Sequence, residues 1–186
     1  MILSLKKVAA LGIVVSLFGV GATWGLKTLT AKEVTGPVEA ETTYGPIKLT
    51  VRLDKNTFRL GENVNVTVTI TNISNETILL AYSLPPKIDF AVYNSSSDII
   101  FSYSRSGGWA MVEVRLILEP SESNSQMWEW NQVQANYYFE SKQVQPGIYY
   151  IAGLTVPYYL GPKDEYRGDY VWLKVETSKV KIEITP

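Results

Sequence analysis

The sequence predicts an all-β fold, an immunoglobulin-like antiparallel β-sandwich preceded by one N-terminal hydrophobic helix. Three observations support this prediction: an uncharged apolar segment near the N-terminus, strict alternation of apolar and polar residues in two later segments, and many short apolar runs separated by turn residues. The same observations divide the chain into an N-terminal segment (1–27), a polar linker (28–46) and the sandwich domain (47–186).

The N-terminal segment has the features of a signal anchor. Residues 8–26 contain no charged side chain and follow Lys6 and Lys7. As a helix, such a segment would span ~28 Å, which is close to the thickness of the hydrocarbon core of a bilayer. The lysine pair would stay in the cytoplasm, so we expect a single-pass cell-membrane protein with an extracytoplasmic C-terminal domain.

Two alternatives remain open for this segment. A signal peptide with its small-residue cleavage site ending at Ala22 would give a secreted protein. A basic pair followed by an apolar helix also resembles an archaeal type IV pilin leader, which would be cut after Lys7 and would make the chain a filament subunit.

The linker and the first strands differ in their patterns. Residues 28–46 are rich in Thr and Glu, contain Pro37 and Pro46, and show no period, which is typical of a tether. Residues 47–53 and 64–72 alternate apolar and polar side chains, the period of a half-buried antiparallel strand. Turn residues separate further predicted strands near 77–83, 88–93, 98–104, 110–118, 125–130, 147–156 and 170–185.

Composition excludes several functions. The chain has no Cys and no His, which excludes disulfides, Cys/His zinc sites and histidine-based catalytic triads. Without the three lysines of residues 1–27, the remainder has 14 basic and 18 acidic residues, so it lacks the basic surface expected of a nucleic-acid-binding protein. The carboxylates are scattered over short strands without a grouping motif. We therefore expect no enzyme, no cofactor and no metal site.

A series of short motifs occurs in a fixed order between Leu53 and Val156. They are an F-x-x-G-E turn, a strand ending in T-N, a D-F-x-V strand, an I-I-F-S-Y-S strand, a turn before a Trp-containing strand, and a late P-G-x-Y strand. Their residues are Phe58, Gly61, Glu62, Val64–Asn72, Asp89, Phe90, Val92, 99–104, Glu119, Pro120, Trp128, Trp130, Pro146, Gly147 and Tyr149.

In these motifs and their order, the chain resembles the BsuPI family of intracellular proteinase inhibitors over roughly residues 53–156. The resemblance implies an immunoglobulin-like β-sandwich and inhibition of a serine protease. It assigns no functional residue to this sequence.

Four N-x-S/T sequons are candidate glycosylation sites. A glycan requires an exposed asparagine outside the cytoplasm, which the predicted anchor would provide. Three of the sequons lie in predicted turns and one on the polar face of a strand, and the chain would then be a glycoprotein. The four are Asn65, Asn72, Asn75 and Asn94.

Exposed aromatic side chains are the candidate contact residues. Tyrosines concentrate in the last third of the chain, and an outward Tyr or Trp ring buries much area on binding at small entropic cost. The candidates are Trp109, Tyr138, Tyr150 and Tyr159.

The main functional hypothesis is a non-enzymatic, membrane-tethered module for protein–protein interaction or cell-surface structure. Its partner would be a cell-surface protein or a second copy of the chain, with the membrane contacted through residues 8–26. The first alternative is a proteinase inhibitor acting outside the cytoplasm through a loop such as 104–109. The second is the pilin-like filament subunit.

Overall fold

The structure is a computed structural model that describes residues 36–83, 85–106, 112–135, 141–157, 159–162, 165 and 173–186. Strands are the main secondary structure of these residues, and they form a β-sandwich of mainly antiparallel sheets. The predicted N-terminal helix, with its alternatives as signal peptide or pilin leader, lies outside the described residues.

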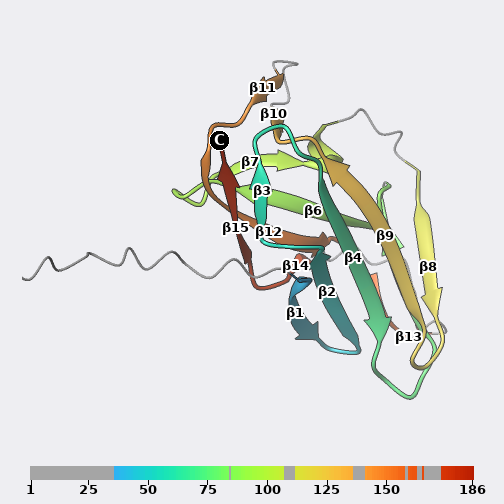
Figure 1. Cartoon of the computed structure of the whole chain (residues 1–186). Helices are drawn as coiled ribbons and strands as arrows, with labels where there is room; N and C mark the ends of the chain where they lie inside the picture. The colour runs from blue at the N-terminus through green and yellow to red at the C-terminus, as the bar shows by residue number, and fades with distance from the viewer. Residues whose placement is uncertain are drawn as a thin grey trace, which may run out of the picture. The chain divides into compact units, whose positions relative to one another are not determined.

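The first sheet has four antiparallel strands in the order β1-β2-β4-β9 (Figure 1). Every apolar residue of the two alternating segments points to one side, and all eight are fully buried. The predicted period of two is thereby confirmed. The strands are β1 (Val38–Tyr44), β2 (Ile47–Leu53), β4 (Val64–Asn72) and β9 (Ser123–Trp130).

The second sheet has the order β3-β15-β12-β6-β7, with β14 also paired to β12. One pair departs from the expected antiparallel arrangement, because β3 runs parallel to β15 with Phe58 opposite Ile184. The strands are β3 (Thr57–Arg59), β6 (Ile88–Tyr93), β7 (Ile99–Ser102), β12 (Gly147–Thr155), β14 (Val175–Glu176) and β15 (Val180–Thr185).

The two sheets pack closely at Gly153 of β12. A Cβ atom at this position would lie 2.9 Å from Cγ1 of Val68 and 3.3 Å from Cβ of Val51, so only glycine fits there without a shift of its neighbours. Aromatic rings fill another part of the core: the centroids of Phe90 and Trp128 are 5.6 Å apart in a tilted arrangement.

Two small sheets extend the sandwich. One has the order β13-β5-β8, from β5 (Ile78–Tyr82), β8 (Val114–Leu118) and β13 (Tyr159–Pro162), and the other pairs β10 (Val133–Ala135) with β11 (Ser141–Gln143). A short 3₁₀ turn, η1 (Tyr103–Arg105), follows β7.

Part of the predicted linker belongs to the domain. Residues 38–44 form β1, which pairs along its whole length with β2, from Val38 opposite Leu53 to Tyr44 opposite Ile47. Val38 and Ala40 pack against the core, and Gly45 at φ 53° closes the turn. The linker boundary at residue 46 is therefore wrong. The strand was not predicted because the segment is rich in Thr and Glu and has only two apolar side chains that face the core.

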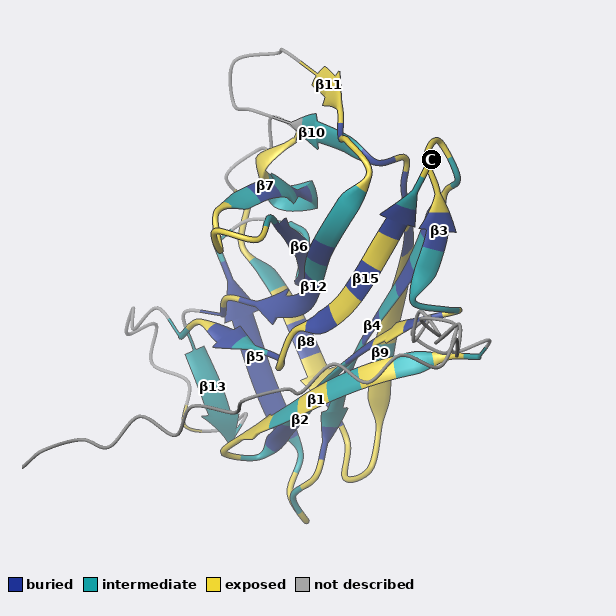
Figure 2. Cartoon of the chain, turned by 60° about the vertical axis from the view of Figure 1, so that its left-hand side comes forward, coloured by how far each residue is buried: buried dark blue, intermediate teal, exposed yellow. Residues whose placement is uncertain are grey.

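Strands β6 and β12 are buried on both faces over part of their length (Figure 2). Ala91 and Tyr93 of β6 pack with Ala152 and Leu154 of β12 in a second, smaller apolar cluster. The ammonium group of Lys179 lies 3.7 Å from the Tyr93 ring centroid and covers part of this cluster. Leu154 of this cluster, and Ile99, which packs against it, also line a cavity beside β6.

Candidate functional site

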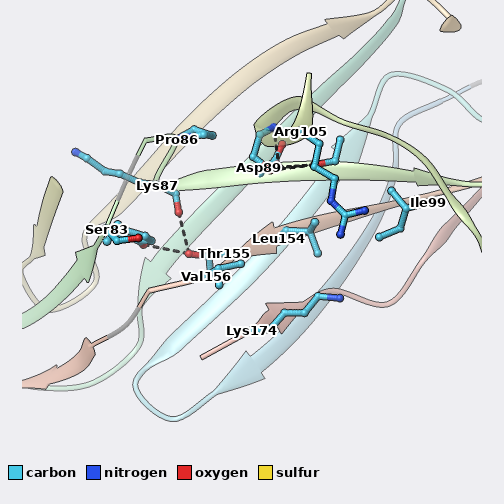
Figure 3. Close-up of a pocket in the computed structure, with 13 residues that line it drawn as sticks. Ser83, Pro86, Lys87, Asp89, Ile99, Arg105, Leu154, Thr155, Val156 and Lys174 are labelled. Carbon is cyan, nitrogen blue, oxygen red and sulfur yellow. Dashed lines mark hydrogen bonds between the residues drawn. The ribbon is translucent and has the colours of Figure 1, made fainter. Parts of the chain in front are cut away.

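A cavity of about 350 Å³ opens where β6 begins and β12 ends (Figure 3). Its walls come from the segment between β5 and β6, from β7 and η1, from the end of β12, and from Lys174 just before β14. Segments up to 92 positions apart in the sequence, from Tyr82 to Lys174, therefore meet at one place.

Asp89 fixes the turn that forms one wall of this cavity. Its Oδ1 accepts hydrogen bonds from the backbone amides of Phe90 (2.7 Å) and Tyr103 (3.1 Å). Its Oδ2 accepts from the hydroxyl of Ser102 (3.0 Å) and the amide of Ser104 (3.1 Å). The side chain is only 6% exposed, so a nearly buried carboxylate satisfies the amides that begin η1.

The turn held by Asp89 exposes Arg105 and Ser106. The amide and the hydroxyl of Ser106 both donate to the carbonyl of Tyr103, at 3.1 and 2.7 Å, and close the turn. An exposed segment is thereby held in one conformation by hydrogen bonds at both of its ends.

The cavity is lined by three cationic side chains, Lys87, Arg105 and Lys174, and by the carboxylate of Asp89. Lys174 pairs with Glu176, with Nζ and Oε2 2.7 Å apart. Burial would raise the pKa of Glu176, but hydrogen bonds from Lys174 and from the Tyr93 hydroxyl outweigh it and lower that pKa. The lining therefore carries three cationic side chains against one carboxylate, so positive charge predominates among the side chains that line the cavity.

The rest of the lining is largely apolar. Ile99, Leu154 and Val156 contribute aliphatic surface. The Tyr82 hydroxyl lies 3.1 Å from Oγ1 of Thr155, which itself donates to the carbonyl of Lys87 at 2.9 Å. Burial raises the pKa of Tyr82, so its hydroxyl stays neutral.

The arrangement suits binding better than catalysis. The hydroxyl of Ser102 donates to Asp89, but that carboxylate accepts three further hydrogen bonds and is held as a structural anchor. Among the described residues there is no group of three or more carboxylates placed to hold a metal ion.

The four sequons lie in different environments. Asn75 is exposed, and Asn65 and Asn94 are half-buried, with their amide groups donating to Asp54 and Asp98. Asn72 is fully buried, and its Nδ2 donates to the carbonyls of Glu76 (2.7 Å) and Leu118 (2.9 Å).

The expectation of a glycan on Asn72 therefore conflicts with the structure. Nδ2 is the atom that would carry the sugar, and it is engaged inside the domain. Glycosylation at Asn65, Asn75 and Asn94 stays a prediction from the sequence.

The predicted contact residues do not gather at the cavity. Tyr150 is half-buried and packs against the second apolar cluster, and Tyr159 donates its hydroxyl to the carbonyl of Pro162 at 2.6 Å. Trp109 and Tyr138 lie outside the described residues. Of the predicted inhibitory loop 104–109, the structure describes residues 104–106.

The role of Asp89 was not predicted from the sequence. A signal was present, because an acidic residue stands inside the otherwise apolar run 88–93 and two serines, at 102 and 104, follow in the next predicted strand. A buried carboxylate needs donors, so the Asp89 position itself indicated a hydrogen-bonded anchor.

The comparisons with known proteins identify one family. The model of the BsuPI family, described as "Intracellular proteinase inhibitor", matches residues 51–157, which are 107 of the 186 residues. This match confirms the resemblance inferred from the motifs. No curated protein sequence matches the chain.

Three solved structures illustrate the similarity in structure. A β-glucosidase from Listeria innocua is 17% identical over 78% of this chain, with a TM-score of 0.42, and this chain spans only 17% of it. The DNA glycosylase AlkC from Pseudomonas fluorescens is 11% identical over 76% of this chain and 31% of its own (TM-score 0.40). A CARDB domain from Pyrococcus furiosus is 14% identical over 77% of this chain and 98% of its own (TM-score 0.35). TM-scores below 0.5 support no argument about function.

The family description corrects the expected location. It names an intracellular inhibitor, and the prediction of a single-pass cell-membrane or secreted protein with an extracytoplasmic domain is therefore wrong. No helix among the described residues is both apolar enough and long enough to cross a bilayer. The predicted membrane segment, 8–26, lies outside those residues.

Proposed function

The chain belongs to the BsuPI family of intracellular proteinase inhibitors, and from this membership we propose that it binds and inhibits a proteinase. The matched residues begin inside β2, end just after β12 and include the turn anchored by Asp89. An inhibitory role also agrees with the non-enzymatic character expected from the sequence.

The hydrogen bonds that anchor residues 103–106 are the observation that supports a particular contact surface for the proteinase. A segment that is ordered before binding loses little conformational entropy on association, which favours tight binding. Asp89 supplies that order from inside the domain, and Arg105 and Ser106 are exposed at the tip. We assign the proteinase contact to this anchored turn, residues Tyr103–Ser106.

The sandwich itself is proposed to be of the immunoglobulin type. In that class, one sheet contains the first two core strands, and the facing sheet contains the last two strands, which pair with each other. Here β2 and β4 belong to the first sheet, and β12 pairs with β15 in the second. The parallel pairing of β3 with β15 and the extra strand β7 beside β6 support a variant with an enlarged second sheet. An experimental structure with β7 paired to β9 instead would refute this class.

The experiment is a titration of endopeptidase activity with the full chain. The panel should contain serine, cysteine, metallo- and aspartic proteinases, each active-site titrated and assayed on a peptide substrate. We expect stoichiometric, reversible inhibition of at least one member. Bovine serum albumin at equal concentration controls for simple competition by a protein substrate.

The intact chain must also survive the assay. Gel electrophoresis after incubation separates an inhibitor, which stays whole, from a substrate that is consumed. The proposed function would be contradicted if no proteinase in the panel lost activity. It would also be contradicted if the inhibition disappeared as the chain was degraded.

A further inference from the structure

We propose that the cavity beside β6 is a binding site for a small apolar carboxylate, with the carboxylate held by Arg105 and the apolar body lying on Ile99 and Leu154. Neither the family description nor the proposed inhibition assigns a ligand to this cavity. The proposal does not rest on the proposed inhibition, although Arg105 belongs both to the cavity and to the anchored turn.

The first step concerns the charge of the site. Arg105 is one of two cavity cations, with Lys87, for which no ion pair occurs among the described residues, and its guanidinium takes part in no hydrogen bond there. Lys174 is paired with Glu176, and the oxygens of Asp89 are occupied by their four donors. A guanidinium binds a carboxylate through two parallel hydrogen bonds, so an anion of this shape is the natural partner of Arg105.

The second step concerns the position of these groups. Figure 3 shows Arg105 and Lys174 extending to the same side of the cavity as Leu154 and Ile99, whereas the ammonium of Lys87 points to the opposite side. An anion at Arg105 would therefore have Lys174, which is paired with Glu176, across the same mouth of the cavity. Its hydrocarbon part would meet aliphatic side chains.

The third step concerns size and polarity. Ligand sites in proteins start at roughly 300 Å³, so a cavity of about 350 Å³ suits a small molecule or a single chain end. Ile99, Leu154 and Val156 offer no hydrogen bond, which disfavours a phosphate with its larger number of oxygens to satisfy. One carboxylate at the cationic edge with an aliphatic tail matches both parts of the lining.

The test uses octanoate as the probe and isothermal titration calorimetry with the full chain as the measurement. Octanamide has the same tail without the charge, and acetate and inorganic phosphate have the charge without the tail. We expect octanoate to bind one to one and each of the other three probes to bind at least about tenfold more weakly, which is the loss of about one charge-assisted hydrogen bond or of the buried tail.

Two variants locate the site. Arg105→Gln removes the charge and leaves a shorter polar side chain, and Ile99→Asp places a carboxylate beside the tail. Each variant should weaken the binding of octanoate at least about tenfold. Arg52→Gln is the matched control, because Arg52 is also exposed but lies on β2 of the other sheet. Thermal unfolding of each variant verifies that it is folded.

The outcomes separate cleanly. Selective loss in Arg105→Gln, with Arg52→Gln like the wild type, supports the site. No octanoate binding to the wild type, equal binding of octanoate and octanamide, equal binding of inorganic phosphate, or an undiminished affinity in folded Arg105→Gln overturns it. Because the readout is binding, failure here leaves the inhibition assay unaffected.

Discussion

Asp89 shows how a single buried carboxylate can organise an exposed segment. Its four hydrogen bonds come from residues 90, 102, 103 and 104, so one side chain ties the first turn of η1 to the start of β6. Charge-assisted bonds of this kind are about twice as strong as neutral ones. The conformation of the anchored turn therefore depends on a residue that the partner would never touch.

Asp89→Asn should destabilise the domain by about 2 to 3 kcal/mol. The amide NH₂ of asparagine would face donors from Ser102 and Ser104, which leaves buried hydrogen-bonding groups unsatisfied. Urea unfolding gives the free energy. Asp98→Asn is the matched control, because Asp98 is exposed in the turn between β6 and β7; a loss no larger than that of this control would refute the anchoring role.

Glu62 provides a test that depends on pH. A hydrogen bond from Lys55, with Nζ and Oε1 2.6 Å apart, and another from the amide of Arg59 hold the pKa of Glu62 below its ordinary 4.5. A lowered pKa in the folded state means that the ionised form stabilises the fold above pH 4.5, and that this stabilisation is lost as the pH falls through the folded value.

Glu62→Gln should therefore cost up to about 1 kcal/mol near neutral pH, since the ion pair is partly exposed, and the difference from the wild type should shrink below pH 4.5. Unfolding free energies measured across this range check the expectation. Glu183→Gln, exposed on β15, serves as the control. A difference that stays constant or grows on acidification would contradict it.

At the level of the strands, the alternation of apolar and polar residues was sufficient to predict a strand where one face is buried and the other is exposed. The predicted strands 47–53 and 64–72 have the bounds of β2 and β4. The prediction failed for β1, because a strand at the edge of a sheet needs few apolar residues, and for the short strands β3, β10, β11 and β13. Such strands owe their conformation to pairing with distant segments.

The cavity could not be predicted for a related reason. Arg105, Leu154 and Lys174 belong to separate strands and loops, and nothing in their local sequence indicates that they meet. The motif containing Asp89 was visible, but the donors that surround it come from η1 and β7. Topology, rather than local pattern, assembles this site.

Gly153 tests how closely β12 packs against the opposite sheet. Gly153→Ala should destabilise the domain by about 1 to 3 kcal/mol, because the added methyl would press on Val51 and Val68, which are short and β-branched. Denaturant unfolding measures the loss. Gly36→Ala is the control, because a Cβ at Gly36 meets nothing within 4 Å; equal stability of the two variants would contradict the close packing.

For the molecule as a whole, the family and the geometry lead to one functional account. The family description is the basis of the proposed activity, proteinase inhibition. The sandwich supplies a rigid support, and the hairpin β6–β7 ends in the turn that Asp89 holds in place. The central claim is that this anchored turn contacts the proteinase.

The most direct measurement compares Ser106→Trp with Ser96→Trp against a proteinase that the wild type inhibits. Ser106 is exposed in the anchored turn, and Ser96 is exposed at the opposite end of the same hairpin. We predict that bulk at Ser106 raises the inhibition constant at least about a hundredfold, the loss of roughly 2.7 kcal/mol of binding, while bulk at Ser96 leaves it unchanged. Wild-type inhibition constants for both folded variants would contradict the account.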